Sequence, residues 1–356
     1  MADELEIDKL ASQLGVTWPH LAEARAQSEQ VKAQLRERLE GLDSADLSIV
    51  AFGSVGRGEV TKSSDLDWTL LVDGSADPKH FETARYIGSL IEGVLKDPGR
   101  EGTFASLVFS HDLVHHIGGE DDTNKNTTRR SLMLLEAVPL GRDEAFERTV
   151  RAILSRYLLE DQTFLERKTR YHVPRFMLND FARYWRTMAV DFAYKRRDRQ
   201  GKGAAIRNLK LRFSRKMLYV SALLTCFSCE LRFGGMADGE KCPSTQAECV
   251  DCLRTWFRKT PLEVLSAMLL HLLEHDDKAD ECAAAAKAVL ASYDEFIGML
   301  ADGVTRKHLE ELAPDAVDGD EIFQRARKLS QSYRDGLLYI FFETKLAVLT
   351  RFYGVF

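Results

Sequence analysis

The segment FGSVGRGEVTKSSDLDW, residues 52–68, decides the fold prediction. A glycine-serine pair, Gly53-Ser54, precedes two aspartates, Asp65 and Asp67, which are spaced i, i+2. The run LSIVAFGS, residues 47–54, predicts a short strand that ends in a turn, and SDLDWTLLVDG, residues 64–74, which alternates and then becomes apolar, predicts a second strand closed by Gly74. Since side chains alternate across a strand, Asp65 and Asp67 are expected on one face.

This combination of a turn and two acids points to a particular ligand. Two neighbouring carboxylates repel each other unless a cation lies between them. Mg²⁺ prefers oxygen ligands and accepts water and phosphate oxygens in its shell, while the N–H groups and hydroxyl of Gly53-Ser54 suit phosphate oxygens. The segment therefore predicts a site for a metal-chelated nucleoside triphosphate, with metals that stabilise an in-line displacement. The alternative is a turn with two solvated acids at a strand edge.

The order Gly-Ser, a loop, then Asp-x-Asp resembles the DNA polymerase β nucleotidyltransferase superfamily. GSVGRGEVTKSSDLDWTLL is similar to two branches: bacterial uridylyltransferases of nitrogen regulation, through Gly-Arg-Gly-Glu and Ser-Asp-x-Asp, and bacterial cyclic-oligonucleotide synthases of antiviral defence. A looser similarity to the uridylyltransferases extends to residue 154. The resemblance implies that Gly53 and Ser54 hold the triphosphate and that Asp65 and Asp67 bind Mg²⁺, with Mn²⁺ as an alternative. Further nucleotide-binding candidates in the segment are Arg57, Lys62 and Ser64.

Members of this superfamily usually carry a third carboxylate on a neighbouring strand, as a metal ligand and as the base for the attacking hydroxyl. The segment TFASLVFSHDLVHHI, residues 103–117, reads as a strand that places Asp112 on its more polar face. Asp112 is therefore the predicted third catalytic and metal-binding acid. Asp121 and Asp122 are the alternative, although acids there also suit a loop or a helix N-terminus.

The chain as a whole predicts an α+β protein. Residues 1–153 read as a nucleotidyltransferase core, a small mixed sheet flanked by helices, with an N-terminal helix that is broken near GVTWP. Residues 154–356 contain helical patterns and no convincing strand, so they are predicted to form an all-helical domain that closes the active-site cleft.

A basic segment, YKRRDRQGKGAAIRNLKLRFSRK at 194–216, stands out in a chain of net charge −6. Helical domains of the superfamily often supply cations to the triphosphate, which makes Arg207, Lys210 and Lys216 candidates for nucleotide binding. A solvated helix face and a tract that binds nucleic acid or an oligonucleotide product are the other interpretations.

The sequence also indicates the cellular location of the protein and the redox state of its cysteines. The N-terminus lacks a signal peptide, and no apolar run reaches the ~18 residues of a membrane span, so we expect a cytoplasmic protein without membrane insertion. The six cysteines are then expected as reduced thiols. Two C-x-x-C pairs mimic a zinc signature, but both read as helix, which leaves zinc ligands and buried thiols as alternatives. They are Cys226, Cys229, Cys249 and Cys252.

The predicted activity is metal-dependent transfer of NMP or dNMP from a nucleoside triphosphate, such as ATP, to an acceptor hydroxyl with release of pyrophosphate. With a nucleotide acceptor the product is an oligonucleotide or cyclic-nucleotide signal of antiviral defence. The alternatives are nucleotidylation of a protein, a tRNA or another RNA, and a non-catalytic nucleotide-binding regulator.

Overall fold

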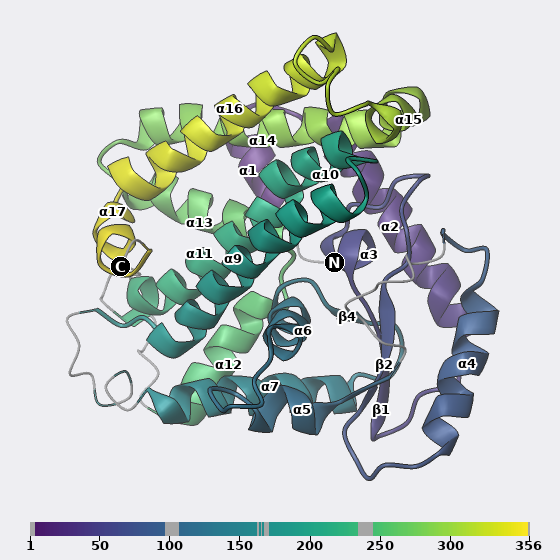
Figure 1. The fold of residues 1–356 in the computed structure, drawn as a ribbon. Coiled ribbons are helices and arrows are strands. Elements are labelled where there is room, and N and C mark those ends of the chain that lie inside the picture. Colours follow the sequence, from purple (N-terminus) through teal and green to yellow (C-terminus); the bar gives the residue numbers. More distant parts are fainter. Residues whose placement is uncertain are drawn as a thin grey trace. The chain divides into compact units, whose positions relative to one another are not determined.

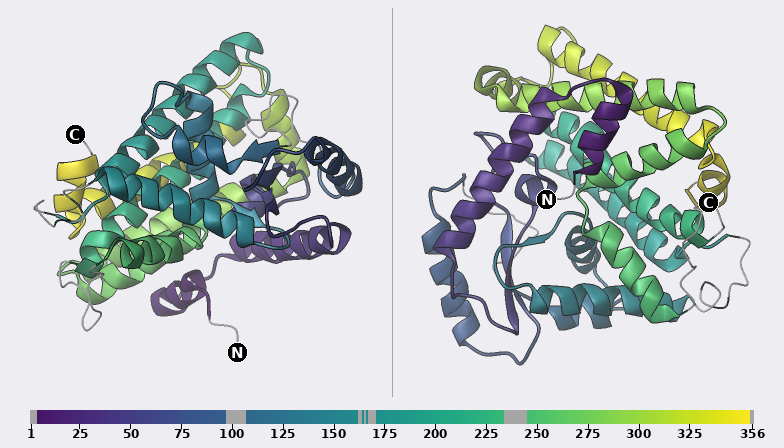
Figure 2. Two further views of the ribbon diagram at one scale, coloured as in Figure 1. Left: turned by 90° about the horizontal axis from the view of Figure 1, so that it is seen from below. Right: turned by 180° about the vertical axis from the view of Figure 1, so that it is seen from behind.

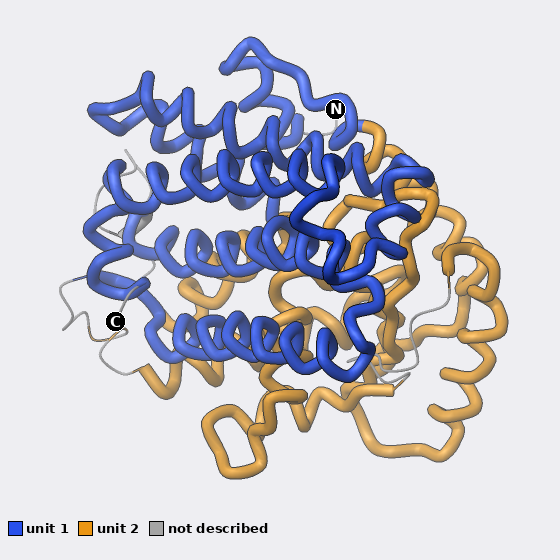
Figure 3. The backbone as a smooth tube through the Cα atoms, turned by 45° about the horizontal axis from the view of Figure 1, so that its top comes forward, with its two compact units in different colours: residues 1–22, 170–242, 261–356 blue, residues 23–169, 243–260 orange. Residues whose placement is uncertain are grey.

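The computed structural model describes residues 4–96, 107–161, 164, 166, 171–233 and 245–354. The chain forms two compact units, both discontinuous in sequence (Figure 3). Unit 1 contains residues 1–22, 170–242 and 261–356, and unit 2 contains residues 23–169 and 243–260. The predicted boundary at 153/154 falls inside helix α7, Glu144–Glu160. The functional division into a core and a cleft-closing domain stays a prediction.

Unit 2 is built around a four-stranded mixed sheet in the order β3-β2-β1-β4 (Figure 1). The strands are β1, Leu47–Ala51; β2, Trp68–Val72; β3, Leu107–Phe109; and β4, Val138–Pro139. Strand β1 runs antiparallel to β2 and β4, whereas β2 and β3 are parallel. This sheet, flanked by helices, confirms the predicted α+β fold.

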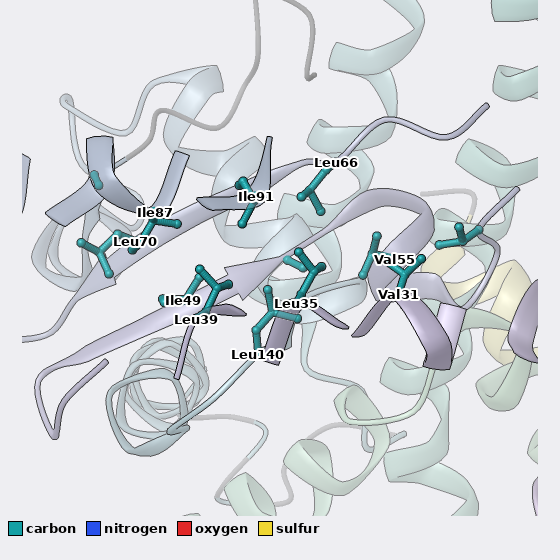
Figure 4. Close-up of a cluster of buried hydrophobic side chains, with 13 residues drawn as sticks. Val31, Leu35, Leu39, Ile49, Val55, Leu66, Leu70, Ile87, Ile91 and Leu140 are labelled. Carbon is teal, nitrogen blue, oxygen red and sulfur yellow. The ribbon is translucent and has the colours of Figure 1, made fainter. Parts of the chain in front are cut away.

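Alternation along β1 assigns its two faces. Ile49 and Ala51 face a hydrophobic core that also contains residues of α2, Pro19–Arg38, and α4, Lys79–Ile91 (Figure 4). Ser48 lies on the opposite face, where its hydroxyl donates to the Arg142 carbonyl (2.9 Å) and accepts from the N–H of Phe146 on α7 (3.2 Å). The sheet is therefore covered by α2 and α4 on one side and by α7 on the other.

Two element predictions next to this sheet are wrong. The helical periodicity of PKHFETARYIGSLIEGVLKD, residues 78–97, predicts a helix that stops at Pro98-Gly99, but α4 ends at Ile91. In the described part of the strand predicted for 103–117, only Leu107–Phe109 is strand, and helix α5, Ser110–His115, follows. The buried pair Leu113 and Ile117 explains the second error, because a spacing of four residues fits one face of a helix and one face of a strand equally well.

The remaining elements of unit 2 are helical. They are α3, Gly53–Arg57; α6, Asn124–Leu135; and α12, Gln246–Phe257. Helix α12 packs on α7, although almost a hundred residues separate the two in sequence. The sheet unit therefore depends on a segment from the second half of the chain.

The described part of unit 1 contains helices and no strand, as predicted for the second half of the chain (Figure 2). Its first helix, α1, Glu6–Leu14, ends at Gly15, whose left-handed backbone (φ 64°) makes the break predicted near GVTWP. The others include α9, Arg175–Asp198; α10, Ala204–Lys210; η1, Leu211–Arg215; α11, Lys216–Phe233; α13, Pro261–His275; α14, Ala279–Ala301; α15, Gly303–Glu311; α16, Glu321–Glu343; α17, Ala347–Leu349; and η2, Thr350–Gly354. Among the described residues, no helix is long and apolar enough to cross a membrane.

Candidate active site

The Gly-Ser turn begins helix α3 directly after β1. Gly53 has a left-handed backbone (φ 64°), a conformation that other residues rarely adopt. A Cβ atom at Gly53 would lie 2.8 Å from Oδ2 of Asp67. The Phe52 N–H also donates to the Asp67 carbonyl at 2.9 Å. The structure therefore brings Gly53, Ser54 and Asp67 together at one end of the sheet, and only a glycine permits the carboxylate to approach the turn this closely.

The hydroxyl of Ser54 is buried and has no hydrogen-bond partner in the part of the chain that the structure describes. Buried hydroxyls in native proteins are normally paired, so an unpaired one calls for a ligand or an ordered water. It lies in the same turn as Gly53, beside the Asp67 carboxylate. A phosphate oxygen is one acceptor that suits this hydroxyl, and the contact of Ser54 with the triphosphate stays a prediction.

The two aspartates precede β2 instead of lying within it, which corrects the predicted strand start. The backbone of Asp65 pairs with that of Lys96 in an isolated β-bridge, and Leu66 donates its N–H to the Lys96 carbonyl at 3.0 Å. The expected alternation survives, because Leu66 is buried between an exposed Asp65 and a half-buried Asp67. Carboxylate and hydroxyl oxygens are ligands that Mg²⁺ and Mn²⁺ prefer, so these residue types fit such an ion. That Asp65 and Asp67 bind the ion stays a prediction.

Arg57, predicted to bind the nucleotide, is held by two buried glutamates. Its Nε donates to Oε2 of Glu59 at 2.7 Å, and its Nη1 donates to Oε2 of Glu136. The side chains of both glutamates are 2% exposed. The guanidinium is thus part of the scaffold behind the turn, and its charge is matched within the protein.

Glu136 is a site residue that the sequence reading missed. Its Oε1 accepts the N–H of Gly53 at 3.2 Å, so one carboxylate joins the turn to Arg57. The only signal for it is a lone acid in the apolar run SLMLLEAVPL, residues 131–140. A buried acid in such a run must be paired, and its pairing partner in this fold is the Gly-Ser turn.

Lys62 and Ser64 lie in the loop between the turn and the aspartates. Lys62 is exposed. Ser64 is buried, and its hydroxyl accepts the Thr61 N–H at 3.0 Å, so it shapes the loop. A role of either residue in nucleotide binding stays a prediction.

Asp112 lies at the other end of β2 from the two aspartates. Val72, the last residue of β2, pairs with Phe109, and Ser110 donates its hydroxyl to Asp73 Oδ1 at 2.6 Å. Five strand residues separate that end from Asp67, which is roughly 16 Å at ~3.3 Å per residue. The structure does not bring Asp112 to the Gly-Ser turn, because β3 runs parallel to β2 and Asp112 follows the end of β3 that is paired with Val72.

Other potential metal ligands surround Asp112. Atoms of His111, Asp112 and His116 lie within 4.8 Å of one another on or next to α5. Imidazole ligands suit transition metals better than Mg²⁺. Of the two alternative acids, Asp122 is buried and pairs with Arg130 through two bonds of 3.1 and 2.9 Å, whereas Asp121 is exposed.

The predicted cations of the second half belong to unit 1. Arg207 and Lys210 lie on α10, and Lys216 begins α11. Arg207 donates to the Lys202 carbonyl, whereas Lys216 is half-buried. Their predicted contact with the triphosphate stays a prediction.

The four cysteines of the zinc-like pattern are buried in helices. Cys226 and Cys229 lie on α11, and Cys249 and Cys252 lie on α12. Burial raises the pKa of the Cys226 thiol, which favours the neutral form over the thiolate that binds zinc. Within the described ranges, none of these thiols belongs to a group of three or more potential metal ligands.

Comparison with known proteins agrees with this geometry. Residues 32–104 match the family model of the nucleotidyltransferase domain, a range that contains the turn, the two aspartates and strands β1 and β2. The chain thus carries a nucleotidyltransferase domain, which supports membership of the polymerase β-type superfamily and confirms the prediction of a transferase that moves a nucleotidyl group. The search of curated proteins and the search of solved structures each gave no significant match.

Proposed function

We propose that the protein transfers NMP from a nucleoside triphosphate to the hydroxyl of a second nucleotide, giving an oligonucleotide or cyclic-nucleotide product. The observation that carries the transfer chemistry is the Asp67 carboxylate lying against the Gly53-Ser54 turn, beside the unpaired hydroxyl of Ser54. The matched nucleotidyltransferase domain covers the same residues.

Each residue of the site has a role in this reaction. The Ser54 hydroxyl donates to a phosphate oxygen of the donor nucleotide. Asp65 and Asp67 would hold the divalent cation, which would supply neutralisation of the charge that develops on the α-phosphate and on the leaving pyrophosphate. The acceptor oxygen bonds to the α-phosphorus, the bond from that phosphorus to the α–β bridging oxygen breaks, and pyrophosphate leaves with its electron pair. The proton of the acceptor hydroxyl passes to solvent water.

The nucleotide acceptor and a role in antiviral defence rest on the resemblance of residues 53–71 to the cyclic-oligonucleotide synthases. A specific observation favours a second candidate, nucleotidylation of a protein or tRNA. Arg57 and Glu59, which carry the Gly-Arg-Gly-Glu resemblance to uridylyltransferases, form the ion network behind the turn. Both candidates use the same donor site and differ only in the acceptor.

The test is to incubate the purified protein with each α-labelled NTP and dNTP, with Mg²⁺ or Mn²⁺, alone and with added lysate. We expect label in a small nucleotide product when only NTPs are present. Label in a protein or tRNA band instead supports the second candidate. A double variant, Asp65→Asn with Asp67→Asn, should transfer no label, and Asp46→Asn, at an exposed acid, is the matched control. Transfer that survives the double variant contradicts both candidates.

A further inference from the structure

Three potential metal ligands lie together just after the end of strand β3. His111 and Asp112 belong to helix α5, and His116 follows its last residue. Ligand atoms of the three side chains all lie within 4.8 Å of one another. Two donor atoms on one zinc ion, each at ~2.1 Å, are at most about 4 Å apart, so small side-chain rotations bring all three to a common ion.

A neighbouring histidine adds a fourth donor to this group. The ring of His115 lies beside that of His111, with centroids 4.6 Å apart, because the two residues are separated by one helical turn. The ring of His116 meets that of His111 edge-on, with centroids 5.9 Å apart. Three imidazoles and one carboxylate are thus concentrated in the six residues HDLVHH, 111–116. Zinc accepts both kinds of donor.

The segment that carries these ligands is anchored within unit 2. Leu113 and Ile117 are buried, and α5 packs on α6 and α7. The side-chain amide of Asn126 on α6 contacts Nδ1 of His116 at 3.2 Å and the carbonyl of Asp121 at 3.4 Å. Metal-binding histidines usually have a hydrogen-bond partner that orients the ring. The contact from α6 provides such a partner for His116.

The ligand atoms are accessible to an ion from solvent. The side chain of His111 is 70% exposed and that of Asp112 is 46% exposed. His111 Nδ1 lies 3.8 Å from Asp112 Oδ1, which is too far for the two to satisfy each other by a hydrogen bond. The charge of Asp112 also acts on Arg129 of α6, where it opposes the lowering of the arginine's pKa by burial. Arg129 thus competes with an ion for this carboxylate, and the imidazoles must provide most of the affinity.

We infer that His111, Asp112 and His116 bind a transition-metal ion of the zinc class. Imidazole nitrogens with one carboxylate suit such an ion better than Mg²⁺, and a water completes a four-coordinate shell. The site lies at the opposite end of β2 from Asp67, so its ion is separate from the ions of nucleotidyl transfer. All three ligands fall within residues 111–116, so the ion joins α5 to the residue that follows it and stabilises that turn of the folded chain.

The test is calorimetric titration of the metal-free full chain with Zn²⁺ in excess Mg²⁺. We expect the affinity to fall at least about a hundredfold in the double variant His111→Gln with His116→Gln. Zinc should also raise the melting temperature of the wild type, because the ion binds the folded state, and should not do so in the double variant. If the wild type binds no zinc, or if the double variant binds it with unchanged affinity, the site is overturned.

Other zinc ligands of the chain supply the controls. His271 and His275 of α13 have the same four-residue spacing as His111 and His115, with ring centroids 4.5 Å apart. The matched control, His271→Gln with His275→Gln, should keep the wild-type affinity, and a loss there overturns the assignment by placing the ion on α13. Co²⁺ in place of Zn²⁺ should give a spectrum without the charge-transfer band of a thiolate ligand. That band would instead assign the ion to cysteines.

A last variant separates this site from the proposed catalytic one. Asp65→Asn with Asp67→Asn should bind zinc with wild-type affinity, whether or not the protein transfers nucleotides. Loss of zinc binding in that variant contradicts a site that is independent of the two aspartates.

Discussion

At the scale of single residues, two side chains define the site. They are the Ser54 hydroxyl, which has no partner among the described residues, and the Glu136 carboxylate, which has two. Ser54 has a buried hydroxyl that no group among the described residues satisfies. Glu136 accepts the Gly53 N–H and pairs with Arg57. The Ser54 hydroxyl is therefore available to a ligand. Glu136 fixes the position of the turn that carries Ser54.

Replacing Ser54 by alanine should separate binding from folding. The Ser54→Ala protein should keep its free energy of unfolding within about 0.5 kcal/mol, because no protein hydrogen bond is lost. Its affinity for a nucleoside triphosphate should fall about tenfold. Urea unfolding and nucleotide titration measure the two quantities. A stability loss with unchanged affinity means that the hydroxyl has a structural role instead.

Glu136→Gln changes charge but not shape. The amide oxygen can still accept the Gly53 N–H, whereas the buried ion pair with Arg57 is lost. We expect a loss of about 1–3 kcal/mol in the free energy of unfolding and a lower kcat. Urea unfolding and steady-state kinetics test this, with exposed Glu120→Gln as the control. If stability and kcat both stay at wild-type values, Glu136 does not position the turn.

Sequence reasoning succeeded where the chemistry is local. Gly53, Ser54 and Asp67 meet because a short loop joins them, and a motif records such a loop. The pairing of Arg57 with Glu136 was not predictable, because the two residues are 79 positions apart and no pattern within the motif reveals the contact. The contact of Arg57 with the nucleotide stays a prediction.

At the scale of elements, helix α3 sits very close to the segment that follows α6. A Cβ atom at Gly56 would lie 1.7 Å from the backbone oxygen of Glu136. Backbone atoms on both sides leave little room for adjustment. This contact therefore fixes α3 against the segment that leads into β4. It also fixes the Gly53-Ser54 turn, because that turn begins α3.

Gly56→Ala should be costly for this reason. We expect it to destabilise the protein by about 3 kcal/mol, the cost of forcing an extra group into a packed interior, and to reduce nucleotidyl transfer. Thermal unfolding and a transfer assay measure both. Gly303→Ala, where a Cβ meets nothing within 4 Å, is the control and should be neutral. Equal stability of the two variants contradicts the close contact.

Helix α2 begins with a cap supplied by a distant helix. The N–H of Leu21 donates to Oδ1 of Asp294 on α14 at 2.9 Å. Burial raises the pKa of Asp294 above 3.8, an effect that its backbone hydrogen bonds only partly offset. The ionised carboxylate is thus disfavoured in the folded protein, even though it caps a helix N-terminus.

The raised pKa makes stability depend on pH. Asp294 binds its proton more tightly in the folded state than in the unfolded state, because its pKa is raised on folding. The protonated group therefore contributes most to the free energy of unfolding below pH 3.8. That stabilisation is lost as the pH rises through the folded pKa. Relative to Asp294→Asn, which does not titrate, the wild type should lose stability over this interval. Urea unfolding of both proteins from pH 3.5 to 7 measures the difference, and a difference that grows in favour of the wild type contradicts the sign.

Elements were harder to predict than motifs for a physical reason. The strand predicted for residues 103–117 became helix α5 at Ser110, because its buried residues fit both periods. The π-helical turn at Leu211–Arg215 has no sequence signal, since it depends on how Phe213 packs on α14 and α16.

At the scale of the whole molecule, each unit is completed by a remote segment. Helix α12 joins unit 2 across the chain, and Arg254 donates to Glu147 of α7 at 2.8 Å. Residues 1–22 belong to unit 1. The order of an α+β half and a helical half was predictable from periodicity, but these exchanges depend on contacts between distant residues.

Removing the second half of the chain should therefore damage the sheet unit. A fragment of residues 1–169 lacks α12, whose buried face includes Val250, Leu253 and Trp256. We expect this fragment to aggregate or to unfold without cooperativity, because the surface of α7 on which α12 packs becomes exposed to solvent. Circular dichroism melts and size-exclusion chromatography test this. A cooperative melt at the temperature of the full chain contradicts a role for α12 in unit 2.

The central claim is that Asp65 and Asp67, beside the Gly53-Ser54 turn, make this protein a metal-dependent nucleotidyltransferase. The most direct measurement is pyrophosphate release from NTPs, with and without Mg²⁺, by the wild type, Asp67→Asn and Asp112→Asn. We predict Mg²⁺-dependent release by the wild type and by Asp112→Asn, and none by Asp67→Asn. Release that persists in Asp67→Asn, or that disappears in Asp112→Asn while that variant stays folded, contradicts the account.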